Sequence, residues 1–253
     1  MKKLELGMAD ISKGNLILVN PTHPIKHDLQ LNELTPLHPY AEHILMERQA
    51  AKMLLQAMAL SGCKSEIIPV SGYRTMQEQQ NIYADSLKEN GEIFTRKFVA
   101  IPGSSEHQTG LAVDLAINNG KIDFIRPEFP YDGICGLFRE IALKCGFIER
   151  YPANREKITK IAHEPWHFRY VGYPHSEIMT GEDLTLEEYT AYLKQFLYKR
   201  KHLHYAKHRY VFEIFYVPVE APSVLIELPE NIPCQVSGNN DDGVVLTLWR
   251  ERL

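Results

Sequence analysis

The chain has 253 residues, 44% of them hydrophobic, and a formal net charge of −4. This length suits one large domain, or one domain with a small appendage. The weak negative charge argues against a general nucleic-acid-binding protein, and no segment approaches the roughly 18 apolar residues of a membrane-spanning helix.

The first residues, MKKLELGMADI, include two lysines but no apolar segment after them. A signal peptide needs both features, so we expect a cytoplasmic protein. The four cysteines contain no C-x-x-C pair, and in that compartment we expect free thiols. Residues 15–25 (NLILVNPTHPI) predict a short strand and then a loop rich in proline. Residues 41–62 predict one long amphipathic helix that ends at Gly62.

Residues 67–87 predict a short buried strand, a tight glycine turn and a helix. Thr75 and Glu78 have the spacing of a capping box, which marks the start of that helix. Arg74 then lies at the end of the turn. Its permanently charged, forked guanidinium could hold the oxyanion of a tetrahedral intermediate. The alternative is an exposed arginine with a structural role.

Residues 90–107 mix glycine, charged and aromatic residues, and we expect them to form a long flexible lid. In GLAVDLA, residues 110–116, large apolar residues alternate with alanine and aspartate, which predicts a half-buried strand. Asp114 lies between two alanines that leave room for a metal and a substrate. The alternative is a solvent-facing strand residue, although aspartate is depleted in strands. Gly110 gives the backbone freedom that could bring His107 to the same place.

The segment HEPWH, residues 163–167, fits the H-E-x-x-H pattern of helical zinc proteases. Pro165 argues against a helix, because proline removes a backbone donor and costs about 3 kcal/mol in a helix interior. Aromatic and β-branched residues follow, so we expect a strand and do not expect His163 to be a ligand. Residues three apart face opposite sides of a regular strand. Pro165 must therefore break the register if Glu164 and His167 are to converge.

Two further helices are predicted at residues 137–146, closed by Gly146, and at residues 185–200, opened by a second capping box. The basic join at residues 199–209 is open to three interpretations: a solvated linker, an anion contact, or a second metal site. Its candidate ligands would be His202, His204 and His208.

Beyond residue 200 the sequence consists of β-rich runs separated by proline and by the turn GNNDDG. These runs predict a small antiparallel unit. We therefore divide the chain into a main domain, residues 1–200, and a β-rich C-terminal subdomain, residues 201–253, whose role the sequence leaves open.

Three residues could together hold a metal ion. His107, Asp114 and His167 offer two imidazole nitrogens and one carboxylate oxygen, a ligand set that leaves the fourth position of Zn²⁺ open for water. Glu164 could take a proton from that water, whose pKa a bound metal lowers to roughly 7. The chain is therefore expected to be a metallohydrolase.

The segments SGYR, SSEHQTGLAVD and EPWHF together resemble the signature of the D-alanyl-D-alanine metallopeptidases, a VanY-like family among the lysostaphin- and hedgehog-like zinc folds. The family's S-x-H-x-x-G-x-A-x-D motif matches residues 105–114, and its E-x-x-H motif matches residues 164–167. The resemblance spans roughly residues 65–175 and is closest to the VanXY type, bifunctional D,D-dipeptidases and D,D-carboxypeptidases of vancomycin resistance. It implies an α+β fold in which helices flank a central antiparallel sheet, here with the small β-rich appendage.

The resemblance also implies roles for single residues. One zinc ion would be held by His107, Asp114 and His167. Glu164 would act as general base and acid, and Arg74 would stabilise the transition state. Three further residues would lie near the substrate: Gln79, Ser105 and Trp166.

The expected function is zinc-dependent hydrolysis of D-Ala-D-Ala and removal of the terminal D-Ala from UDP-linked muramyl pentapeptide, which would withdraw the target of vancomycin. One alternative is a lysin-type peptidoglycan endopeptidase, which would differ by its insoluble substrate. Another is a non-catalytic binding module with the same zinc fold. A pure binder needs neither Glu164 nor Arg74, which argues against it. The sequence leaves open the ratio of the two activities, the tolerance of a terminal D-Ser or D-lactate, and a homodimer.

Overall fold

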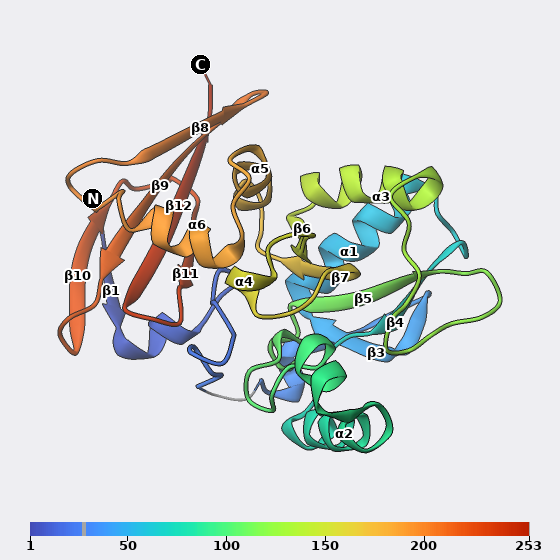
Figure 1. Ribbon diagram of the computed structural model, residues 1–253. Coiled ribbons are helices and arrows are strands. Elements are labelled where there is room, and N and C mark those ends of the chain that lie inside the picture. The colour runs from blue at the N-terminus through green and yellow to red at the C-terminus, as the bar shows by residue number, and fades with distance from the viewer. Residues whose placement is uncertain (27–28, 253) are drawn as a thin grey trace. The chain divides into compact units, whose positions relative to one another are not determined.

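Residues 1–26 and 29–252 are described by the computed structural model, and their helices and strands belong to two units (Figure 1). The larger unit is Val19–Thr185, and the smaller unit joins Met1–Leu18 to Leu186–Leu253. None of the described helices is both long and apolar enough to cross a membrane. The mixed α+β fold with antiparallel sheets is confirmed.

A four-stranded antiparallel sheet forms the centre of the larger unit. Its strands, in spatial order, are β4 (Ile67–Ser71), β5 (Ala112–Ile117), β7 (Glu164–Tyr170) and β6 (Phe147–Tyr151). The strands expected from the alternation in GLAVDLA and from the β-rich residues after Pro165 are therefore confirmed. Because β5 and β7 are the inner strands and almost all their residues are buried, polar side chains on them face a closed interior.

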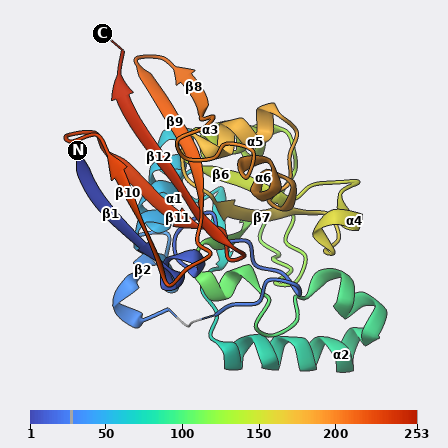
Figure 2. The same ribbon diagram turned by 90° about the vertical axis from the view of Figure 1, so that its left-hand side faces the viewer.

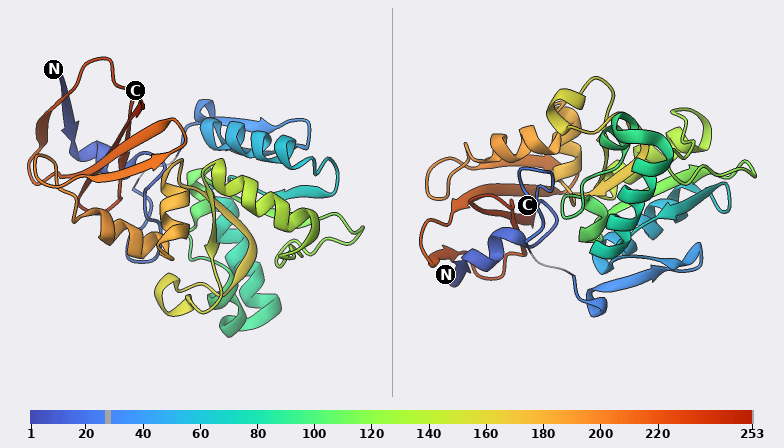
Figure 3. Two further views of the ribbon diagram at one scale, coloured as in Figure 1. Left: turned by 90° about the horizontal axis from the view of Figure 1, so that it is seen from above. Right: turned by 60° about the horizontal axis from the view of Figure 1, so that its bottom comes forward.

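Helices cover both faces of this sheet. In Figures 1 and 2, α1 (Arg48–Ser61) and α3 (Gly133–Lys144) lie above the sheet and α2 (Met76–Phe98) lies below it. Figure 3 shows α1 and α3 side by side. The remaining elements of this unit are shorter: η2 (Leu31–Glu33), the hairpin β2 (Leu34–Leu37) and β3 (Ala41–Glu47), η3 (Glu106–Thr109), α4 (Glu156–Thr159) and α5 (His175–Gly181).

The segment of residues 41–62 departs from the predicted single helix. Its first seven residues form β3, which pairs with β2, and only Arg48–Ser61 is helical. The Glu47 carboxylate accepts hydrogen bonds from the backbone N–H groups of Gln49 and Ala50, so it caps the helix at the change of structure. The expected end is confirmed, since Gly62 has the left-handed φ of 67°. The strand expected in residues 15–25 is wrong: only an isolated bridge joins Asn20 and His23.

The capping box of Thr75 and Glu78 opens α2 as predicted. The flexible lid predicted for residues 90–107 is wrong for the first half of the segment, because α2 continues to Phe98. A break occurs at Gly91, which has a φ of 79°. The helical turns on its two sides are joined by a 2.8 Å hydrogen bond between the hydroxyls of Ser86 and Thr95.

The smaller unit contains the antiparallel β structure expected after residue 200. A four-stranded sheet has the order β11 (Cys234–Gly238), β12 (Gly243–Glu251), β9 (Tyr210–Pro218) and β8 (Leu203–Lys207). A second pair joins β1 (Lys2–Gly7) to β10 (Ser223–Leu228), and η1 (Met8–Ser12) and α6 (Leu186–Leu193) complete the unit. The turn GNNDDG connects β11 to β12 as a hairpin.

The division into units differs from the one expected at residue 200. Every residue of β1 pairs with β10, and the Leu16 amide donates to Ser237 Oγ at 2.8 Å, so the first 18 residues belong with the C-terminal strands. Leu6 and Ile11 are buried in the same apolar core as the inner side chains of β9, β10 and β12. Sequence periodicity does not report such a pairing, because the partners lie more than two hundred residues apart along the chain.

Candidate active site

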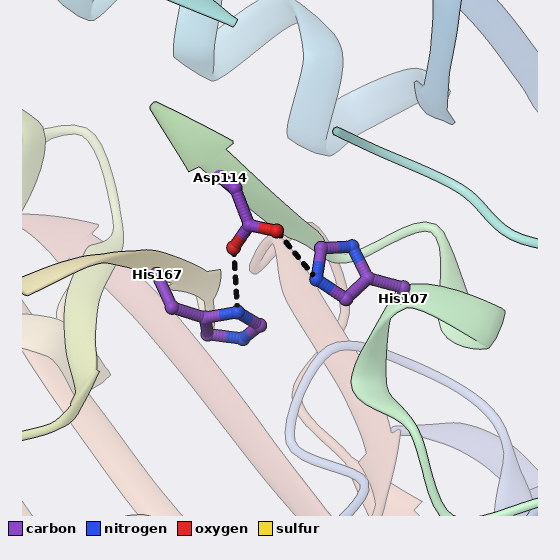
Figure 4. A group of neighbouring side chains, drawn as sticks. All are labelled: His107, Asp114 and His167. Carbon is purple, nitrogen blue, oxygen red and sulfur yellow. Dashed lines mark hydrogen bonds and ion pairs between the residues drawn. The ribbon is translucent and has the colours of Figure 1, made fainter. Parts of the chain in front are cut away.

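Asp114 and His167 meet because their strands pair in this register. Asp114 on β5 lies directly opposite His167 on β7, and His167 Nδ1 lies 2.9 Å from Asp114 Oδ1. His107 comes from η3 and brings its Nε2 to 3.1 Å from Asp114 Oδ2 (Figure 4). All three side chains are buried. The structure thus brings together the three residues that the sequence suggested as ligands.

The ring of His107 is held by the turn that precedes α2. Its Nδ1 lies 2.7 Å from the carbonyl oxygen of Gly72, so this nitrogen donates and Nε2 remains free to accept a metal ion. A side chain at Gly72 would not fit, because a Cβ there would lie 2.4 Å from the carbonyl oxygen of Leu45. Gly110 ends η3 with a φ of 66°, the backbone freedom expected for the approach of His107.

The register break expected at Pro165 is present as a bulge. Phe168 pairs with Glu149 and Glu164 pairs with Tyr151, so four steps along β7 match two steps along β6. This irregularity brings Glu164 to the same side as His167, with Glu164 Oε2 3.8 Å from His167 Nδ1. The break lies within the strand pair rather than in a loop before it.

Arg74 contributes all three arms of its guanidinium to this site. Nη2 donates to Asp114 Oδ2 at 3.2 Å, Nε to Ser71 Oγ at 3.0 Å and Nη1 to Gln79 Oε1 at 3.4 Å. Its side chain is only 18% exposed, so Arg74 is not the exposed structural arginine of the alternative interpretation.

The proton affinities of Glu164 and His167 are shifted in the metal-free site. Burial raises the pKa of Glu164 to about 8. Burial alone would lower the pKa of His167, but the hydrogen bond to Asp114 and the nearby Glu106 carboxylate raise it to about 9. A divalent cation would favour the ionised carboxylate and the neutral imidazole instead. A carboxyl that titrates near neutral pH has the property of a general base.

The other two members of the group are already in the states that bind a metal. Burial alone would raise the pKa of Asp114, but the charges and hydrogen bonds of His107 and His167 hold it well below its usual range. Burial and the nearby Arg74 guanidinium lower the pKa of His107. These shifts favour the ionised form of Asp114 and the neutral form of His107, the forms that coordination requires.

Among the described residues, these three form the one group of His, Cys, Asp or Glu side chains whose ligand atoms all lie within 4.8 Å of one another. In a tetrahedral zinc site with bonds of about 2.0–2.1 Å, neighbouring ligand atoms lie about 3.4 Å apart. The imidazole nitrogens of His167 and His107 lie 2.9 and 3.1 Å from different oxygens of Asp114, and one ligand atom from each of the three residues lies within 4.8 Å of the other two. The donor set and its spacing therefore fit a zinc ion after small side-chain movements.

The other histidines that were considered as metal ligands from the sequence lie outside this site. His163 Nε2 is 2.7 Å from the Tyr131 hydroxyl and 3.3 Å from Glu149 Oε1. His202 Nδ1 is 2.6 Å from Glu213 Oε1, and the join that contains it continues directly into β8 rather than forming a solvated linker. Within the described chain, His202, His204 and His208 belong to no metal-binding cluster.

A cavity of about 350 Å³ opens onto the group. The proposed ligands, Glu164 and Arg74 line it, as do two of the expected substrate contacts, Ser105 and Trp166. Gln79 is fully buried and is not among the described lining residues. It instead holds Arg74, and its Nε2 donates to the Ala100 carbonyl at 2.8 Å. Residues from α2 and from the loop around Phe124 also line the cavity.

Sequence reasoning missed Glu106, which immediately precedes His107. Its carboxylate is fully buried and lies beside His167. A charged residue next to a metal ligand is a weak signal by itself. The two arginines that make its burial possible, Arg150 and Arg169, lie on other strands, so sequence spacing could not connect them.

The comparisons with known proteins agree on one family. The family model described as VanY, D-alanyl-D-alanine carboxypeptidase, matches residues 43–173, a range that contains every residue of the site described above. The chain is 42% identical over 184 residues to the bifunctional D-Ala-D-Ala dipeptidase and D-Ala-D-Ala carboxypeptidase VanXYC of Enterococcus gallinarum. That match covers 72% of this chain and 96% of the relative, so the relative is the shorter protein.

Two solved structures extend the comparison. The vancomycin resistance D,D-dipeptidase VanXYg, in complex with a D-Ala-D-Ala phosphinate analogue, is 50% identical with a TM-score of 0.95. The match covers 98% of this chain and 99% of that one. A variant of the D,D-pentapeptidase VanY from a VanB-type resistance cassette, in complex with Zn(II), is 29% identical with a TM-score of 0.57. That match covers 69% of this chain and 98% of the VanY chain.

Proposed function

Because the chain belongs to the VanY family of D-alanyl-D-alanine carboxypeptidases, we propose that it is a zinc-dependent D,D-dipeptidase and D,D-carboxypeptidase. Its substrates would be D-Ala-D-Ala and the UDP-linked muramyl pentapeptide of the cytoplasm, from which it removes the terminal D-Ala. Loss of this terminus withdraws the target of vancomycin and so gives resistance. The names of the relatives VanXYC and VanXYg support this proposal.

The observation that carries the proposal is the position of Glu164 beside a complete ligand set. His107, Asp114 and His167 would hold one zinc ion, and Glu164 Oε2 lies 3.8 Å from His167 Nδ1 without belonging to the group. When bound there, zinc would polarise the scissile carbonyl and lower the pKa of water. A site for binding alone would not need a separate carboxyl at this place.

Glu164 performs both proton transfers in the proposed reaction. As a carboxylate it takes a proton from the attacking water, and as a carboxylic acid it gives that proton to the amine of the leaving D-alanine. Burial raises the pKa of Glu164 in the metal-free site, whereas a bound cation would favour its ionised form, the form that takes the proton from water. The products from the pentapeptide are a tetrapeptide with a new terminal carboxylate and free D-alanine, and D-Ala-D-Ala gives two molecules of D-alanine.

Arg74 stabilises the negative charge that develops on the carbonyl oxygen. Its guanidinium lines the cavity and is held by Ser71, Gln79 and Asp114 before substrate binds. Donors that are already oriented need no reorganisation during the reaction, and this preorganisation is the basis of oxyanion stabilisation. Gln79 therefore serves as a support for Arg74, whereas Ser105 and Trp166 remain the proposed substrate contacts.

The size of the cavity favours a small peptide end over a large glycan strand. About 350 Å³ is near the lower end of the roughly 300–1,000 Å³ of small-molecule sites. A second cavity of about 280 Å³ lies next to it, and the two share Val99, Ala100, Tyr151 and Ile161 along their walls. This adjoining space could hold the preceding residues of a pentapeptide.

The test is release of D-alanine and of peptidoglycan fragments from three substrates in parallel: D-Ala-D-Ala, UDP-linked muramyl pentapeptide and intact peptidoglycan, each with and without a chelator. We expect hydrolysis of the two soluble substrates, loss of activity with the chelator and recovery with zinc. Release of fragments from intact peptidoglycan alone would favour the lysin-type endopeptidase. Zinc binding without hydrolysis of any substrate would favour the binding module.

A further inference from the structure

Glu106 is the most deeply buried acid near the site, and the proposed mechanism gives it no role. It belongs to η3, the same short turn that supplies His107, and its side chain has no solvent exposure. Isolated carboxylates are almost never buried in this way, since desolvation of the charge is costly. The burial of Glu106 therefore requires partners that compensate its charge.

The two carboxylate oxygens of Glu106 face different partners. Oε1 accepts from Arg150 Nε at 2.8 Å and lies 2.7 Å from Arg169 Nη1. Oε2 faces His167 Nε2 at 3.6 Å. The two arginines come from neighbouring strands, β6 and β7, and neither side chain is exposed. One oxygen thus anchors the carboxylate while the other is directed at the imidazole.

The Glu106–His167 contact joins two polar atoms that lack other partners. Within the described residues, Glu106 Oε2 and His167 Nε2 are both buried and neither has a hydrogen-bond partner. Their separation of 3.6 Å is just beyond hydrogen-bond distance. A small rotation of the His167 ring would bring the two atoms within hydrogen-bond distance. We expect this hydrogen bond to form when His167 binds a metal ion.

The opposite nitrogen of the same ring faces the proposed zinc position. His167 Nδ1 points to Asp114 and lies 3.8 Å from Glu164, whereas Nε2 points away toward Glu106. The ring of Tyr151 packs against this imidazole, with 4.9 Å between the two ring centroids. The guanidinium carbon of Arg150 lies over the Tyr151 ring, 4.9 Å from its centroid. A proton kept on Nε2 leaves the lone pair of Nδ1 for a cation.

We propose that Glu106 is a positioning residue that accepts the Nε2 proton of His167 in a hydrogen bond and so presents Nδ1 to the metal. This inference rests on the proposed function, because it assumes a metal ion between His107, Asp114 and His167. Arg150 and Arg169 hold the Glu106 carboxylate in place through Oε1. Carboxylates and carbonyls that hold the second nitrogen of a metal-binding histidine fix its tautomer and raise its basicity. Gly72 provides the corresponding carbonyl for His107.

If Glu106 only neutralised the two arginines, a variant that keeps its charge should bind zinc as the wild type does. Two variants separate this possibility from the positioning role. Glu106→Gln removes the charge and leaves an amide near His167. Glu106→Asp keeps the charge opposite Arg150 and Arg169 but withdraws the carboxylate from the ring by one methylene. The matched control is Glu149→Gln, since Glu149 is also paired with an arginine, Arg139, but contacts His163 instead of a ligand.

Zinc affinity is measured by competition with a chromophoric chelator on the purified full-length chain. We expect Glu106→Gln and Glu106→Asp each to bind zinc about 10- to 100-fold more weakly than the wild-type chain, and Glu149→Gln to bind it equally well. In ¹H–¹⁵N spectra of the zinc-loaded imidazoles, His167 should show a protonated Nε2 that exchanges slowly in the wild type and rapidly in both Glu106 variants.

The outcomes distinguish this inference from the proposed function. Wild-type zinc affinity and an unchanged His167 spectrum in Glu106→Asp overturn the positioning role, even if Glu106→Gln fails to fold. A folded wild-type chain that binds no zinc overturns the proposed function itself. If Glu149→Gln loses as much affinity as the Glu106 variants, the effect is a general one of buried charge and the positioning role is again overturned.

Discussion

At the scale of single residues, the site depends on side chains that are held from outside the metal group. His107 is fixed by the Gly72 carbonyl, Arg74 by Ser71 and Gln79, and His167 by its contacts with Asp114 and Tyr151. Each of these supports lies on an element adjacent to the residue it holds. The chemistry therefore requires few reactive groups but many positioned ones.

Replacement of Glu164 by glutamine should separate metal binding from turnover. The variant keeps His107, Asp114 and His167, so we expect zinc to bind at the wild-type stoichiometry. The amide cannot accept a proton, and kcat should fall by about 10²- to 10⁴-fold. Zinc content by atomic spectroscopy and D-alanine release on the same preparation provide the measurement. Loss of stoichiometric zinc would instead place Glu164 among the ligands.

Replacement of Arg74 by lysine keeps the charge but loses the forked geometry. An ammonium cannot contact Ser71, Gln79 and the reacting oxygen together, so kcat should fall by about 10²- to 10³-fold while zinc affinity is retained. Arg209→Lys, at an exposed position of the smaller unit, is the control and should behave as wild type. Near-normal kcat in the Arg74 variant would show that charge alone suffices.

Much of the site could be predicted from the sequence because its residues occur in short motifs. The spacing in SSEHQTGLAVD and EPWH gave three ligand candidates and a base, and the structure brings their side chains together. Glu106 lies in the first motif and was still missed. Its contacts with His167, Arg150 and Arg169 depend on how β6 and β7 pair, and no local pattern encodes that pairing.

At the scale of elements, the errors occurred where tertiary partners override local pattern. Residues 41–47 continue the apolar periodicity of α1, but pairing with β2 makes them a strand. The mixed composition of residues 90–98 suggested a loop, although the helix continues beyond the break at Gly91. The strands β5 and β7 were predictable because their β-rich residues and their contacts favour the same structure.

The helix α5 begins with His175, which is fully buried and should make the larger unit sensitive to acid. Burial lowers the pKa of His175 to about 3, whereas an unfolded histidine titrates near 6.5. The unfolded chain therefore binds more protons between these values, and stability is lost as pH falls below 6.5. From pH 7.5 to pH 5 this one group should remove about 2 kcal/mol from the free energy of unfolding.

Urea unfolding of the wild type and His175→Gln at both pH values provides the measurement. Glutamine does not titrate in this range, so the variant's loss of stability between pH 7.5 and pH 5 should be smaller by about 2 kcal/mol. The comparison uses each protein's own value at pH 7.5, which cancels the packing cost of the substitution. Equal losses in the two proteins would show that His175 does not titrate on unfolding in this range.

At the scale of the whole molecule, every residue with a proposed catalytic role lies in Val19–Thr185. The relative VanXYC is shorter than this chain and is matched over 96% of its length, which indicates that the activity does not need 253 residues. We therefore expect Val19–Thr185, expressed alone, to bind zinc and to hydrolyse D-Ala-D-Ala. Activity per zinc-loaded molecule is the quantity to measure.

A second truncated chain, which keeps the first 18 residues, provides a control. A chain of residues 1–185 retains β1 without β10 and leaves Leu6 and Ile11 without the core that buries them. It should aggregate more than residues 19–185, as light scattering would show. If a folded, zinc-loaded Val19–Thr185 hydrolyses no dipeptide, the smaller unit must contribute to catalysis.

The pairing of β1 with β10 also bears on the order of events during protein synthesis. Lys2 pairs with Leu228, so β1 is synthesised more than two hundred residues before its partner strand. At about 5–20 residues per second this delay is roughly 10–45 s. Val19–Thr185 emerges as a whole within that interval and can fold first. β1 must meanwhile stay unpaired, and its two consecutive lysines help to keep it from joining other nascent chains.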